Sequence, residues 1–200
     1  WLMGWRATTN PAADRTVIAS VVQRVGVGHK MPLFHFSPSI GAPFAAAFLA
    51  NSNALSLDFV ARQKVGGTSL TYHYLKQFVY LPPDRYAEAD LAFIAPRVLE
   101  LTYTAHDLKP WADDLAAYDL RPAGQRGTPF AWNPERRAQI RAELDAYYAR
   151  LYSLTRDELR YILDPADVMG ADYPSETFRV LKDKEIKQFR TLRAGQNVKC

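Results

Sequence analysis

The sequence has one cysteine, Cys200, which leaves no partner for a disulfide within the chain and excludes a cysteine-based metal site. No run of about 18 apolar residues occurs, so no membrane-spanning helix is expected. The first residues, Trp1 to Arg6, lack the basic start, apolar core and cleavage site of a signal peptide. We therefore expect a cytoplasmic protein without a membrane partner. Because position 1 is not Met, we also expect this chain to be part of a longer one.

Catalytic motifs are also missing. The sequence contains no Gly-x-Ser-x-Gly elbow, no phosphate-binding loop and no Cys/His pair. Its histidines have no metal-ligand spacing, and its acidic pairs are typical of helix starts. The turn from Val25 to His29 lacks the third glycine of a dinucleotide fingerprint. We therefore expect neither catalysis nor a bound cofactor or metal in this chain.

The charge is unevenly distributed. Among 200 residues, 48% are hydrophobic, as in packed globular proteins, and the net charge is +4. Residues 1–80 carry +5, residues 81–120 carry −5 and residues 121–200 carry +4. A basic first segment favours a polyanionic partner, although a folded surface can carry such an imbalance by chance.

Residues 1–120 read as a mixture of strands and helices. Residues 15–36 are rich in β-branched residues and predict two strands. Residues 43–63 predict a helix, in which Asn51 to Asn53 interrupt the apolar stripe and allow close approach of another backbone. A strand is predicted within 70–81, where the aromatics alternate, and two short helices within 88–120. The alternating rings (Tyr72, Tyr74, Phe78 and Tyr80) serve either core packing or stacking on an unpaired base.

Residues 121–200 read as largely helical. A loop at 121–129 is the best candidate for a boundary, and Asn133 with Pro134 starts a helix that runs to Leu151. A capping box at Thr155 starts a second helix, and 176–193 predicts a third. The expected fold is α/β, with α+β possible. We expect residues 1–120 to form a mixed, β-containing region and residues 121–200 to form a helical C-terminal extension.

The segment from Arg62 to Lys76 has the composition of a nucleic-acid contact. A basic helix end is followed by a Gly66-Gly67 turn, so that cationic and amide side chains stand beside accessible backbone amides. A solvated helix end, whose cations favour the helix dipole, is an equally open interpretation. The candidate DNA-binding residues are Arg62, Gln63, Lys64, Gly66, Gly67, Thr68, Ser69, Thr71, His73 and Lys76.

Several blocks of the chain resemble the C-terminal part of bacterial adenine-specific DNA methyltransferases, of the type IIG restriction–modification and PglX-like kinds. The likeness covers nearly the whole chain and fades after about Arg190. It rests on Arg6 with Thr9-Asn10 and Asp14 to Ala19, on Leu49 to Phe59, on Lys64 to Phe78 with Leu81-Pro82-Pro83, and on the blocks 141–152, 154–165 and 177–182.

The resemblance implies the DNA target-recognition region of an N6-adenine methyltransferase in a restriction–modification or phage-defence system. The partners would be double-stranded DNA and the methyltransferase domain of the parent protein, whose cofactor is S-adenosylmethionine. That family's Asn/Asp-Pro-Pro-Tyr/Phe motif is absent, since Leu81-Pro82-Pro83-Asp84 has the wrong neighbours. The parent's nuclease motif is not recognisable either. The alternative is a docking module that uses the apolar stripe of Ile140, Leu144, Tyr147 and Leu151.

Overall fold

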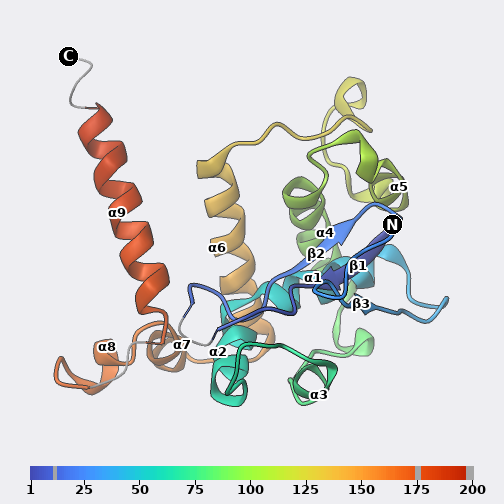
Figure 1. Ribbon diagram of the computed structural model, residues 1–200. Helices are drawn as coiled ribbons and strands as arrows, with labels where there is room; N and C mark the ends of the chain where they lie inside the picture. The colour runs from blue at the N-terminus through green and yellow to red at the C-terminus, as the bar shows by residue number, and fades with distance from the viewer. Residues whose placement is uncertain (11–12, 174–176, 197–200) are drawn as a thin grey trace.

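The computed structural model describes residues 1–10, 13–173 and 177–196, with residues 188–196 described by their backbone alone. A small antiparallel sheet near the N-terminus is joined to a mainly helical remainder (Figure 1). Its central strand β1 (Leu2–Trp5) pairs with β2 (Ala19–Val22) on one side and with β3 (Leu33–Phe34) on the other. The predicted mixed fold with a helical C-terminal part is confirmed.

The helices lie along the rest of the chain. In Figure 1, α9 extends away from the other helices, and α3 lies apart from α4 and α5. Short 3-10 turns start at Pro83, His106, Ala116 and Ala123. The α-helices are α1 (Ala42–Asn53), α2 (Leu55–Lys64), α3 (Tyr72–Leu75), α4 (Glu88–Thr102), α5 (Lys109–Asp114), α6 (Pro134–Leu151), α7 (Arg156–Leu163), α8 (Ala166–Met169) and α9 (Arg179–Gln196).

One hydrophobic core joins the sheet, α1, α4 and α6. The small side chains of Ala45 to Ala47 are fully buried and let α1 lie close against α4. Ile140 and Leu144 of α6 belong to the same core as Trp5 of β1. Much of the apolar stripe that motivated a docking role is therefore packed inside this chain. The division at residue 120 stays a prediction.

The predicted helix at 43–63 is two helices. The chain turns extended at Ala54, and α1 and α2 meet at a bend of 57°. Side chains from other elements satisfy the backbone groups that the break frees. The Asp145 carboxylate accepts a hydrogen bond from the Leu55 amide at 2.7 Å, and the Arg15 guanidinium donates to the Asn53 carbonyl at 2.9 Å. These long-range partners explain why local periodicity did not show the break.

The asparagines of α1 bind neighbouring backbone, as their small polar side chains predicted. Asn53 accepts from the Ala19 amide and donates to the Ala19 carbonyl, both at 3.1 Å, and so pairs with the outer edge of β2. Fully buried Asn51 accepts from the Leu81 amide and donates to the Tyr152 hydroxyl at 2.7 Å. Polar side chains thus replace the strand and helix partners that these segments lack.

The predicted strand within 70–81 is wrong. Residues 72–75 form α3, and the nearest strand-like pairing is an isolated bridge between Thr8 and Ser69. Both edges of β1 are already occupied by β2 and β3, so the alternating aromatic run has no edge of that strand to join. Its buried residues are instead Leu70, Leu75 and Phe78, whose spacing fits a turn followed by one helical turn.

Other sequence-based predictions agree with the structure. The Asn133 side chain accepts a hydrogen bond from the Arg136 amide and caps α6, and Pro134 is its first residue. Thr155 and Glu158 form the predicted capping box of α7. Two helices, α4 and α5, lie within 88–120. The predicted third C-terminal helix corresponds to α9, although Glu176 lies outside the described residues.

The segment that connects α5 to α6 is held by a local clamp. Arg121 donates two hydrogen bonds to the Asp119 carboxylate, at 2.9 and 2.7 Å. The same guanidinium donates to the Thr128 carbonyl and lies over the Phe130 ring, 3.6 Å from its centroid. One side chain therefore ties both ends of this loop together.

Replacement of Asn53 tests its role as a partner of the β2 edge. We expect Asn53→Ala to lower the free energy of unfolding by about 1–3 kcal/mol, because it leaves buried backbone groups of Ala19 without a partner. Urea denaturation should show a lower midpoint with an unchanged slope. The control is Gln63→Ala, an exposed site on α2. Equal midpoints for the two variants would contradict the assignment.

The Asp119–Arg121 pair predicts a pH dependence of stability. The hydrogen bonds from Arg121 hold the pKa of Asp119 below its usual 3.8. A carboxyl with a lowered folded-state pKa contributes stability above its unfolded pKa and loses it as pH falls through the folded-state pKa. We expect Asp119→Asn to lower the urea midpoint at neutral pH, and this difference to shrink below the unfolded pKa. Asp107→Asn, at an exposed position, is the control; a difference independent of pH would refute the prediction.

Candidate nucleic-acid interface

The segment from Gln63 to Lys76, called the loop below, runs from the last turn of α2 through a turn to the end of α3 and is anchored to the chain that follows β1. Its backbone donates from the Leu70 amide to the Ala7 carbonyl at 2.7 Å, and Thr68 accepts from the Thr9 amide at 3.0 Å. The Trp5 indole nitrogen donates to the Leu70 carbonyl at 2.8 Å. The buried side chains of Val65 and Leu70 attach the loop to the hydrophobic core. The exposed residues between these anchors are therefore presented from a defined backbone rather than from a free tail.

Nine of the ten predicted site residues lie exposed along this loop: Gln63, Lys64, Gly66, Gly67, Thr68, Ser69, Thr71, His73 and Lys76. Within the described structure, a Cβ atom added at Gly66 or Gly67 would meet no atom within 4 Å, and neither glycine has a positive φ. The fold itself therefore does not require glycine at these two positions. Their lack of side chains leaves the loop backbone open to a partner from outside.

Arg62, the tenth predicted residue, occupies a different environment. Its guanidinium forms an ion pair with Asp58 at 2.9 Å, and both side chains are buried. It also donates to the carbonyls of Ala13, Asp14 and Thr177, and lies over the Phe178 ring. A phosphate contact by this side chain would require these bonds to break. The structure therefore places the Arg62 side chain in the interior, and a phosphate contact by Arg62 stays a prediction.

In the described part of residues 1–80, both acidic side chains form ion pairs, whereas several basic side chains are exposed and unpaired. Both acidic residues of the first 80 are neutralised, Asp58 by Arg62 and Asp14 by Lys184 at 2.8 Å. Lys184 also lowers the pKa of Asp14, so this carboxylate stays charged and paired. In the described part of the chain, five exposed cations of this segment have no ion pair or side-chain hydrogen bond: Arg6, Arg24, Lys30, Lys64 and Lys76.

Two of these cations were missing from the predicted site although they lie beside the loop. Ala7 accepts from Leu70 on one side, and its own amide donates to the Lys30 carbonyl at 2.9 Å. Lys30 and Arg6 therefore flank the same short stretch of backbone as the loop. Their sequence separation hid this relation, because it depends on pairing around β1. The charge excess of residues 1–80 was the available signal.

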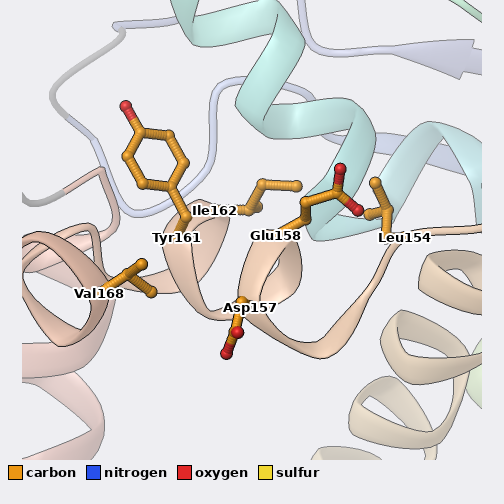
Figure 2. Close-up of a pocket in the computed structure, with 6 residues that line it drawn as sticks. All are labelled: Leu154, Asp157, Glu158, Tyr161, Ile162 and Val168. Carbon is orange, nitrogen blue, oxygen red and sulfur yellow. The ribbon is translucent and has the colours of Figure 1, made fainter.

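Two surface grooves differ in chemistry. A groove of about 380 Å³ lies over α7, and Figure 2 shows Leu154, Glu158 and Ile162 on one side of this helix with Asp157 pointing away from them. The Glu158 carboxylate is held by Thr155, whose backbone and hydroxyl hydrogen bonds lower its pKa. The negative charge of Glu158 makes this groove unsuitable for a phosphate.

The second groove, of about 470 Å³, lies next to the loop and is lined by apolar and aromatic side chains. It opens between β3, α1 and the start of α3, where Tyr72 forms part of its wall. The predicted set of alternating rings is therefore divided by the fold. Phe78 is buried in the core, whereas Tyr72 is exposed at the groove.

No group of three or more His, Cys, Asp or Glu residues in the described parts of the chain can hold a metal ion. No single described helix is long and apolar enough to cross a membrane, and only the α1–α2 pair, bent by 57°, passes such a test by length and composition. No family model, curated protein or solved structure matches the chain.

Arg62 and Lys64 provide a matched pair of substitutions in the last turn of α2. We expect Arg62→Ala to lower the free energy of unfolding by about 3–5 kcal/mol, because it leaves the Asp58 carboxylate buried without its counter-ion. Lys64→Ala removes an exposed cation and should change it by no more than about 0.5 kcal/mol. Urea denaturation of both variants measures the difference. Similar stabilities would show that Arg62 is not a structural residue.

Proposed function

We propose that this chain is the DNA target-recognition portion of an adenine-specific N6 DNA methyltransferase of a restriction–modification or related phage-defence system. It has no catalysis of its own in this proposal. Double-stranded DNA is its ligand, and the methyltransferase domain of the parent protein is its partner. The adenine-specific part of the proposal rests on the resemblance of the sequence blocks, and the parent's S-adenosylmethionine would bind outside this chain.

The observation that carries the DNA-binding part is a set of four unpaired cations in or beside the exposed, anchored loop: Arg6, Lys30, Lys64 and Lys76. Phosphates are recognised by Lys and Arg side chains and by free backbone amides. Lys64 and Lys76 supply basic side chains from within the loop, and the exposed backbone at Gly66 and Gly67 supplies the amides. Gln63, Thr68, Ser69 and Thr71 add neutral donors and acceptors of the kind that read base edges.

The helical part supports a second candidate, a protein-docking module. Five of the ten large apolar side chains exposed in the described structure lie between Leu163 and Ile186. Exposed apolar side chains are typical of protein contacts where they lie together in one patch. This set replaces the stripe on α6 as the observation that favours docking, because Ile140 and Leu144 are buried.

The salt dependence of DNA binding separates the two candidates. We expect Lys64→Gln with Lys76→Gln to weaken binding to a duplex pool and to reduce the slope of log K against log salt by roughly 0.9 for each phosphate that is no longer neutralised. Lys109→Gln is the control, because this exposed lysine pairs with Asp113 in the acidic segment. Fluorescence anisotropy at several salt concentrations gives both quantities. Absence of salt-sensitive binding by the unmodified chain would favour docking.

A further inference from the structure

The groove next to the loop is built from rings that the fold leaves partly exposed. Six aromatic side chains line it: Phe34, Phe36, Phe44, Phe48, Tyr72 and Tyr86. None of the residues that line it is buried, and Tyr72 is 49% exposed. A concave surface of this composition, at about 470 Å³, has the size and apolarity of small-molecule sites. The groove is therefore an accessible surface rather than a gap in the core.

A hydrogen bond and several ring–ring contacts hold the aromatic side chains of the groove in place. Tyr72 donates its hydroxyl proton to the Leu33 carbonyl at 2.9 Å and packs edge-on against Trp5, with ring centroids 4.7 Å apart. Phe48 lies edge-on to both Phe34 and Phe36, and stacks on Tyr80. Such mutual edge contacts fix the orientation of each ring. A planar ligand would therefore meet a surface that is already ordered.

Charge around the groove decides which planar ligand fits. Tyr72 belongs to the cationic loop, where His73 follows it directly and Lys76 lies one helical turn further on. His35 is itself part of the groove wall, and Lys30 precedes the β3 segment. Pro83 also lines the groove and is followed by Asp84 and Arg85, whose charges offset each other. An apolar wall beside unpaired cations is complementary to a nucleotide, which joins a flat base to an anionic phosphate.

We infer that this groove stacks one unpaired base of a DNA strand, while Lys64, Lys76 and Lys30 contact the adjoining phosphates. The inference rests on the proposed function and extends it from duplex phosphates to a base outside the helix. Stacking on aromatic rings is tolerant of base identity, because every base has a flat π face. The groove therefore adds affinity for an unpaired base with little sequence preference, whereas sequence choice belongs to the polar loop.

Two oligonucleotides of equal length separate base stacking from charge. One is a short oligothymidylate, and the other is the same sugar–phosphate chain without bases. The unmodified chain should bind oligothymidylate about tenfold more tightly than the abasic chain, as expected for one stacked base. Tyr72→Ala should remove most of this preference and leave abasic binding unchanged. Tyr72→Phe should retain the preference, because the ring remains.

Three further variants make the result decisive. Phe36→Leu keeps an apolar side chain but removes a ring, so it should reduce the same preference without disturbing the Tyr72 contacts. Lys64→Gln should weaken binding to both oligonucleotides equally. Trp132→Ala, which removes an exposed ring outside the groove, should change neither affinity. Denaturation curves confirm that each variant is folded.

The outcomes distinguish this inference from the proposed function. Salt-sensitive duplex binding with equal affinity for the two oligonucleotides would overturn the base site and keep the proposed function. In that case the groove would be a contact surface for an apolar protein segment. A preference for oligothymidylate without duplex binding would keep the groove as a base site and overturn duplex recognition. Failure to bind any of the three nucleic acids would overturn both.

Discussion

The carboxylate of Asp58 is fully buried and accepts hydrogen bonds from the amides of Thr16 and Val17, while Arg62 neutralises it from the next turn of α2. Arg62 extends the same network to the carbonyls of Ala13, Asp14 and Thr177. A buried charge is tolerated only when it is paired and hydrogen-bonded. The N-terminal segment, α2 and the chain before α9 are therefore held in one arrangement, and the loop after α2 begins from a fixed point.

Polar side chains play the same part elsewhere in the interior. Asn53 pairs with the edge of β2, Asn51 joins Leu81 to Tyr152, and Asp145 accepts from the first amide of α2. Burial raises the pKa of Asp145, and the charge of Arg15 and the hydrogen bond from the Leu55 amide oppose this rise. Each of these side chains completes hydrogen bonds that a three-stranded sheet and a broken helix leave open.

This use of polar groups shapes the surface. The acids of the first 80 residues are paired, Asp58 in the interior and Asp14 with Lys184 of α9, while five cations of that segment remain exposed. A net charge of only +4 therefore conceals a local excess around the loop. The aromatic groove adjoins this excess through Tyr72, so that an apolar and a cationic surface meet at one residue.

The sequence by itself determined the elements that carry local signals. Asn133 and Thr155 cap α6 and α7 as their patterns predicted, and the end of α2 before Gly66 was correct, because caps and turns depend on neighbouring residues. Tertiary structure alone decided the break at Ala54, the helical turn at 72–75 and the burial of Arg62. The break at Ala54 depends on Asp145, and the helical turn at 72–75 depends on the occupied edges of β1. The burial of Arg62 depends on Asp58 together with distant carbonyls. Local periodicity contains none of these long-range partners, so only the fold could separate the exposed loop cations from the interior arginine beside them.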